Sequence, residues 1–307
     1  MAAKRIGVVE PLLWAAAVAA VALAPTVLSR FQVVQATVFL IDAMLALSLD
    51  LVWGLAGILS FGQAALFGLG GYVYGIVGIN TEVPALALLA GMAGPALLAA
   101  LIGYVTFYGR VGPMYFAVIT LTVTLILLQL MGNTADPRYA IGAARLGGYN
   151  GMTNIPTLTL TVPGLLRIGP RPVPQFYAAA GLLLVVLAAC VALSRTTFGR
   201  VLRAIRENET RTELLGYDVR WRKVVAFVIA GAIAGLAGGL FASWGNFINP
   251  EVFSLPQSAL VVIWVLVGGR GTLYGAVLGA VVVQYIASAL GAAGSSYTTV
   301  MLGSVLV

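Results

Sequence analysis

The charged side chains of this sequence gather in one stretch, residues 194–223, which could bind a soluble partner but carries no catalytic set. Only 9% of the chain is charged. Twelve of these charges lie in this charged segment: Arg195, Arg200, Arg203, Arg206, Glu207, Glu209, Arg211, Glu213, Asp218, Arg220, Arg222 and Lys223. The chain has no His and one Cys, Cys190, so His-based catalysis, His metal sites and an internal disulfide are excluded. We expect neither a catalytic nor a metal-binding residue.

Part of the charged segment has the pattern of one or two short helices. Apolar residues alternate with charges over residues 201–215, and Gly216 follows as a helix stop. Glu207 and Arg211 are four residues apart, in the favourable order for an ion pair within a helix. Setting the topology of a membrane protein needs a few cations but no structured amphipathic element. A helix that docks on a soluble partner is therefore favoured over a plain solvated loop.

A second group of polar residues lies within apolar sequence. Carboxylates inside membrane spans are costly and point to function by default, yet Asp42 and Asp50 could equally be structural. The glycine-rich stretch 50–75 predicts either close helix packing or a broken helix that lines a path. In the second case we expect Ser60 and Gln63 to line that path, and Asp50 and Gly62 are further candidates for it.

The composition decides the class of fold. The chain has 307 residues, 61% of them hydrophobic, and a mean hydropathy of +1.01, whereas soluble domains are about 45–50% apolar. Several uncharged runs reach the roughly 20 residues that a bilayer span needs. We expect an all-α polytopic membrane protein, one permease-like domain over residues 1–307 with about 8–10 transmembrane helices, some broken at glycines. The net charge of +7 is typical of a cytoplasmic excess of Lys and Arg, so we expect no nucleic-acid partner.

The connections between spans predict the orientation. Residues 132–172 form the longest polar loop, rich in Gly, Pro, Asn and Thr, with irregular structure or a hairpin expected. Lys4, Arg5, Arg110, Arg270 and the charged segment fall on one side of the alternating spans, and the fewer remaining cations fall on the other. The positive-inside rule therefore predicts a cytoplasmic N-terminus and charged segment, and an outward-facing 132–172 loop. An apolar run that is too short to cross ends at Val307, so we expect a further helix beyond it.

Several motifs together resemble one family. The stretch from Gly199, GRVLRAIRENETRTELLGYDVRWRKVVAFVIAGAIAGLAGGLFA, is similar to the cytoplasmic loop and following helix of permeases of branched-chain amino acid type ABC importers. LSLDLVWGLAGILSFGQAALFGLGGY and the loop motif LGGYNGMT match two further family patterns, and the resemblance covers about residues 40–285. LDLVWG, INP and VVIWVLVGGRGTLYGA look more like the branch for urea and short amides. The family's usual His is Gln63 here, which removes any proton chemistry at that position.

The resemblance implies partners and roles. Such a chain would work in a bacterial cytoplasmic membrane, surrounded by lipid, with a homologous second permease, two cytoplasmic ATPases and an extracytoplasmic binding protein. It would need no cofactor of its own: it has no phosphate-binding loop, so ATP and Mg²⁺ would be bound by the ATPases. A short coupling helix would receive their motion, and the residues implied for it are Arg203, Arg206, Glu207, Asn208, Glu209, Glu213 and Gly216.

Three alternatives stay open from the residues. The substrate could be a branched-chain or other hydrophobic amino acid instead of urea or an amide. A stand-alone secondary transporter or channel would also use broken, glycine-rich spans, but would need neither ATP nor an ATPase. A purely structural membrane scaffold would tolerate disruption of the charged segment without loss of uptake.

Overall fold

The structure is a computed structural model that describes residues 2–136, 138–158, 161–162, 166–167 and 172–292, and it is a helical bundle. Within this part of the chain, seven helices are long and apolar enough to cross a membrane. These are α2 (Arg30–Leu49) with its π-helical extension η1 (Asp50–Leu55), α3 (Gln63–Thr81), α4 (Pro84–Tyr108), α5 (Pro113–Gly132), α6 (Pro172–Arg195), α9 (Val219–Gly245) and α11 (Tyr274–Ala292). The predicted fold class is confirmed.

The remaining elements are shorter or lie at the edge of the bundle. The helices among them are α1 (Ala2–Val27), α7 (Thr197–Glu207), α8 (Glu209–Leu214) and α10 (Leu255–Gly268), with 3-10 turns η2 (Gly148–Asn150) and η3 (Pro250–Phe253). The two-residue strands form three antiparallel pairs: β1 (Ala140–Ile141) with β2 (Ala144–Arg145), β3 (Met152–Thr153) with β6 (Phe247–Ile248), and β4 (Thr161–Val162) with β5 (Leu166–Arg167).

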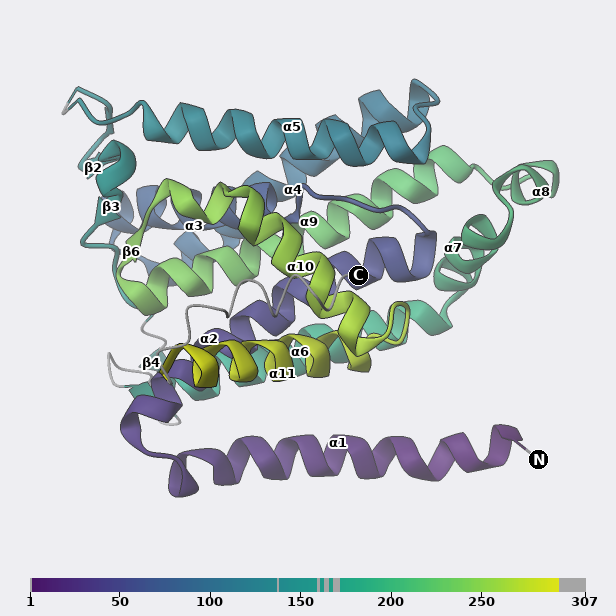
Figure 1. Ribbon diagram of the computed structural model, residues 1–307, viewed down its shortest axis with the longest axis horizontal. Coiled ribbons are helices and arrows are strands. Elements are labelled where there is room, and N and C mark those ends of the chain that lie inside the picture. Colours follow the sequence, from purple (N-terminus) through teal and green to yellow (C-terminus); the bar gives the residue numbers. More distant parts are fainter. Residues whose placement is uncertain (1, 137, 159–160, 163–165, 168–171, 293–307) are drawn as a thin grey trace.

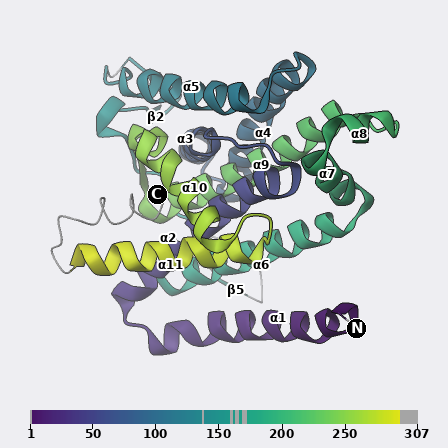
Figure 2. The ribbon, with the colours of Figure 1, turned by 45° about the vertical axis from the view of Figure 1, so that its right-hand side comes forward.

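The long helices run roughly side by side, so the molecule has two ends (Figure 1). The α7–α8 end also carries the N-terminus, the α4–α5 connection and the turn between α10 and α11, while the small strands gather at the opposite end, which we call the strand end. The alternation expected from the sequence is therefore present in the arrangement of the helices. A second view shows α1 lying along the outside of the bundle, and α7 and α8 projecting from it (Figure 2).

The bundle is closed by helices that approach each other through small residues. A Cβ atom added to Gly235 of α9 would lie 2.6 Å from Cγ of Pro95 in α4, and it would also meet the carbonyl oxygen of Gly91. Gly231 lies equally close to α4, since its Cβ would be 2.7 Å from Cβ of Ala99. Glycine at these positions lets the backbones of α4 and α9 touch.

The glycine-rich stretch 50–75 combines the two structures expected of it. The helix widens to a π-helix over Asp50–Leu55, ends near Gly57, whose φ is +77°, and resumes at Gln63. Beyond the break, the glycines of α3 pack closely: a Cβ on Gly70 would collide with the backbone of Gly235. π-helical turns are rare in proteins, and those that occur are often found at functional sites. The break is therefore a candidate functional site.

The expected outer loop and C-terminal extension are only partly visible. The loop begins with the β1–β2 hairpin and continues through η2 to β3, which pairs with β6 after α9. This confirms short hairpin and irregular structure. Residues 159–160, 163–165 and 168–171 of the loop, and residues 293–307 with the helix expected to continue past Val307, lie outside the described residues.

Candidate functional site

Helix α7 is amphipathic and packs on the bundle through its apolar side. Val201, Leu202 and Ile205 are buried, and the Thr196 hydroxyl caps the helix by accepting a hydrogen bond from Gly199 N. Arg203, one of the residues expected for coupling, donates from Nη2 to the Ser194 carbonyl at the end of α6, 2.5 Å away. Arg203 thus holds α7 against α6.

Arg206 joins α7 to the π-helical break. Its Nη1 donates to the Gly54 carbonyl at 2.6 Å, and its side chain remains 32% exposed. The contact is close, because a Cβ on Gly57 would lie 2.9 Å from Cγ of Arg206. A widened helix leaves carbonyls poorly paired, and a guanidinium supplies the missing donor.

Asp50 joins the same break to the turn between α10 and α11. It is fully buried, and its carboxylate accepts hydrogen bonds from Gly271 N at 2.6 Å and Leu273 N at 2.9 Å. Arg270, in the same turn, donates to the Trp53 carbonyl at 3.2 Å and stacks its guanidinium 4.8 Å from the Trp53 ring. Burial, and then the nearby charge of Arg206, lower the pKa of Arg270.

These contacts form one unit, which we call the η1 junction: η1, Arg206 and residues 269–273. It connects α7 to α2 and to the α10–α11 turn through side chain to backbone hydrogen bonds. Beside it lies a cavity of about 340 Å³, lined also by Arg195 and Arg203. One side of the η1 junction therefore borders open space.

Helix α8 begins at a sharp corner. Asn208 has extended backbone angles, ends α7, and caps α8 by accepting a hydrogen bond from Arg211 N at 2.9 Å. This corner corrects one expectation: Glu207 and Arg211 lie on different helices, and Glu207 pairs with Arg206 at 3.3 Å. The pattern of charges alone could not locate a break at Asn208.

Two ion pairs hold α8 against α9. Glu209 contacts Lys223 at 2.5 Å, and Glu213 contacts Arg220 at 3.6 Å. The Lys223 ammonium also lies 5.8 Å from the centre of the Phe107 ring in α4. Glu209 and Glu213, expected as partner contacts, therefore fix the position of α8.

Exposed apolar side chains gather at and just after the C-terminal end of α8. Leu214 and Leu215 are 83% and 69% exposed, and Tyr217 and Trp221 are exposed nearby in the chain. Gly216 provides the turn with φ of +86°. We call these four side chains the α8 apolar face. Sequence reasoning recognised the leucines as part of an amphipathic element but assigned the contact to charged residues.

The expected pathway residues other than Asp50 surround the start of α3. The Ser60 hydroxyl accepts a hydrogen bond from Gly62 N at 3.1 Å, and a Cβ on Gly62 would lie 2.9 Å from Cβ of Thr120. Oε1 of Gln63 accepts a hydrogen bond from the Ser48 hydroxyl at 3.1 Å, while its buried Nε2 has no partner in the described part of the chain. An unpaired buried amide is rare enough to require an explanation.

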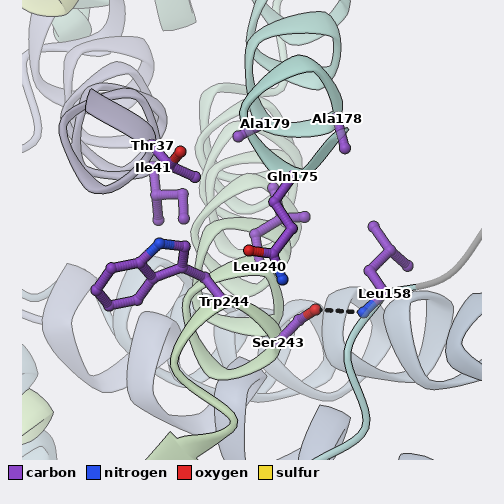
Figure 3. A pocket seen from close by; sticks show the side chains of 9 residues that line it. All are labelled: Thr37, Ile41, Leu158, Gln175, Ala178, Ala179, Leu240, Ser243 and Trp244. Carbon is purple, nitrogen blue, oxygen red and sulfur yellow. Dashed lines mark hydrogen bonds between the residues drawn. The ribbon is translucent and has the colours of Figure 1, made fainter. Parts of the chain in front are cut away.

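A gap between α2, α6 and α9 does not qualify as a solute site. Figure 3 shows its lining, including Gln175, Trp244 and Ser243, whose hydroxyl accepts a hydrogen bond from Leu158 N at 2.6 Å. Its volume is about 10 Å³, which is room for about one water molecule.

Comparison with known proteins decides the family. A family model described as "Branched-chain amino acid transport system / permease component" matches residues 33–307. The chain belongs to this permease family. It is 31% identical over 310 residues to the high-affinity branched-chain amino acid transport system permease protein LivM of Escherichia coli K12, covering 92% of this chain and 69% of that protein. It is also 31% identical over 291 residues to the ribose import permease protein RbsC of the same strain, covering 92% and 84%. No solved structure matches significantly.

Family membership states what kind of component this permease is. It is a multi-pass, non-catalytic membrane subunit of an ABC importer in the branched-chain amino acid and sugar family, homologous to bacterial inner-membrane permeases. ATP is bound by partner ATPases, and membership implies a second permease and a binding protein as well.

Proposed function

We propose that this permease imports urea or short-chain amides, driven by an ATPase that docks on the α8 apolar face. The observation that carries the coupling part is the exposure of Leu214 and Leu215 on a helix held in place by two ion pairs. Exposed apolar side chains with charged residues around them are typical of protein–protein contacts. In this proposal the α7–α8 end is cytoplasmic and the N-terminus lies on the same side.

The η1 junction supplies the next step of the mechanism. A pull on α8 moves α7, and Arg206 passes this movement to the Gly54 carbonyl. Asp50 then transmits it to the α10–α11 turn through the backbone of Gly271 and Leu273. Of the residues expected to couple, Arg206 acts directly, Arg203, Asn208, Glu209, Glu213 and Gly216 position the two helices, and Glu207 stabilises Arg206.

The choice of substrate rests on sequence motifs. LDLVWG, INP and VVIWVLVGGRGTLYGA resemble the urea and short-amide branch, and they include Asp50 and most of the α10–α11 turn. A branched-chain amino acid is the second candidate, favoured by the name of the LivM relative. The assembly would contain a homologous second permease, two ATPases and an extracytoplasmic binding protein.

The coupling part is tested by removing the α8 apolar face. In Leu214→Ser/Leu215→Ser we expect loss of ATPase co-purification and loss of ATP-dependent uptake in proteoliposomes. The matched control is Tyr139→Ser, an exposed apolar side chain in the loop at the strand end, which should change neither. If the double variant retains its ATPase and its uptake, α8 is not the docking helix.

The substrate part is tested with the same vesicles. Wild-type complex should concentrate urea or acetamide in the presence of ATP, and should not concentrate leucine. Uptake of leucine alone would assign the second candidate. Uptake that proceeds without ATP or an ATPase would instead establish a stand-alone transporter.

A further inference from the structure

A polar cavity opens among helices that are otherwise apolar. Its volume is about 520 Å³, which lies within the 300–1,000 Å³ range of small-molecule sites. Segments far apart in the chain line it: α2, α3, α9, η3, α10 and α11. We call it the α2–α11 cavity.

Carboxyl and amide side chains form part of the cavity lining. Asp42 of α2 is buried and accepts a hydrogen bond from Nε2 of Gln284 in α11. Asn249 and Glu251 of the α9–α10 connection add an amide and a carboxylate, and Gln257 of α10 adds a second amide. Asp42 and Gln284 lie within membrane spans, where polar groups are costly and default to a functional role.

The charges of the lining select a class of ligand. The cavity has two carboxylates, Asp42 and Glu251, and its described lining residues include neither Lys nor Arg. The ammonium of an amino acid could pair with one of these carboxylates, but its own carboxylate would find no cation in the described lining, and such an unpaired charge disfavours the ligand. A solute with several N–H donors and one carbonyl suits both the carboxylates and the three amide side chains.

Two buried polar groups lie one helical turn from residues that line the cavity. Phe67 of α3 and Leu260 of α10 line the cavity. Gln63 precedes Phe67 by four residues and Trp264 follows Leu260 by four, so each shares a helix face with a lining residue and lies one turn further on. Nε2 of Gln63 and Nε1 of Trp264 are both buried, and neither has a hydrogen-bond partner among the residues that the structure describes. Two unpaired donors on two helices beyond the same cavity suit a solute carbonyl in transit.

We propose that the α2–α11 cavity is a binding site for a neutral amide-type solute, with Asp42 and Gln284 as its principal contacts and Gln63 and Trp264 as the next ones. This inference rests on the proposed import function and deepens it. The solute donates N–H groups to the two carboxylates. Its carbonyl accepts from an amide side chain in the cavity and afterwards from Gln63 or Trp264.

The chain offers a matched pair of variants. Gln284→Leu removes an α2–α11 hydrogen bond that faces the cavity, whereas Gln35→Leu removes the Gln35–Ser288 bond, 3.0 Å long, which joins the same two helices outside the lining. In the complete complex we expect Gln284→Leu to raise the KM for urea or acetamide at least tenfold while the ATPase rate persists. Gln35→Leu should leave KM unchanged. If both variants change KM equally, the Asp42–Gln284 hydrogen bond serves helix packing and does not bind solute, which would overturn the proposal.

A labelling experiment tests binding without transport. The lone Cys190 is buried, so Gln257→Cys places a single accessible thiol in the cavity. Urea and acetamide should slow its reaction with a small maleimide in the nucleotide-free complex, while labelling of Gln35→Cys should not change. If ethylammonium or leucine protects Gln257→Cys and the amides do not, the ligand class is wrong. Failure of wild type to import any solute with ATP would refute the import function, yet protection by amides would still stand.

Discussion

Two charged side chains, Asp50 and Arg206, satisfy backbone groups that breaks in regular structure leave unpaired. Asp50 accepts two N–H groups of the α10–α11 turn, and Arg206 donates to a carbonyl of the π-helix. An unpaired backbone group within a membrane costs several kcal/mol. The two residues therefore stabilise a shape that could not persist without them.

Replacing Asp50 with Asn should destabilise the permease. An Asn side chain has one carbonyl oxygen for two N–H donors, and its own NH₂ would face the other, so we expect a loss of about 1–3 kcal/mol. The melting temperature of the purified complex should fall by several degrees. Thr122→Val is the control, because the Thr122 hydroxyl is exposed and bonds only within its own helix. An unchanged melting temperature would show that the turn does not depend on Asp50.

The residue-level site could be predicted only in part. Asp50 and Arg206 were singled out by their types, but as members of separate groups, one for a pathway and one for coupling. Gly271 is 221 positions from Asp50, and such a pairing has no trace in local sequence. Asp42 was noticed because it is a carboxylate in a span, whereas Gln284 has no local pattern that distinguishes it.

At the scale of elements, α8 depends on its ion pairs for position. Six residues are too few for a stable isolated helix, and Glu209–Lys223 and Glu213–Arg220 attach it to α9. Lys223 is largely buried within this contact, so its pair should contribute more than the 0–1 kcal/mol of a fully exposed one.

A charge exchange tests this attachment. Glu209→Lys and Lys223→Glu should each weaken ATPase binding several-fold, because like charges push α8 from its position. The double exchange should recover most of the affinity, measured by titration of purified ATPase. Arg200→Glu is the control. It reverses a charge on the exposed side of α7 and measures how much a charge change outside the α8–α9 ion pairs affects ATPase binding. A double variant no better than the single ones would mean that the pair does not position α8.

The close crossing of α9 with α3 and α4 yields a second prediction at this scale. Gly235→Ala forces a methyl group against Gly91 and Pro95, and overpacking of this kind costs about 1–3 kcal/mol. Gly181→Ala in α6 is the matched control, since nothing lies within 4 Å of its new Cβ. We expect lower yield and a lower melting temperature for the first variant and no loss for the second. Equal stability would contradict the contact.

Helices could be predicted where the residues that determine them are neighbours in the sequence. Long apolar runs located the membrane helices, and the many glycines of residues 50–75 predicted close packing or a break there. The π-helix and the corner at Asn208 were not predicted in detail, because both depend on contacts with distant parts of the chain. The pairing of β3 with β6 across α6 and α9 is similarly non-local.

At the scale of the whole molecule, α2 links the two proposed sites. Asp42 faces the α2–α11 cavity and Asp50 begins the η1 junction, eight residues and about 12 Å further along one continuous span. Helix α11 also connects the two sites. It begins just after the turn that Asp50 binds, and its Gln284 lines the α2–α11 cavity. In the proposed mechanism, movement of α7 can therefore reach the solute site through α2 and through α11. An importer needs such a connection between the ATPase and the solute.

The mechanism requires that the α7–α8 end face the cytoplasm, and the single buried cysteine makes this testable. Thr210→Cys in α8 and Tyr149→Cys at the strand end place thiols at opposite ends of the molecule. In intact cells, a membrane-impermeant maleimide should label Tyr149→Cys and spare Thr210→Cys, because the positive-inside bias orients the cation-rich end inward. Permeabilised cells should label both, which controls for reactivity. Labelling of Thr210→Cys alone in intact cells would reverse the orientation and remove the ATPase from reach of α8.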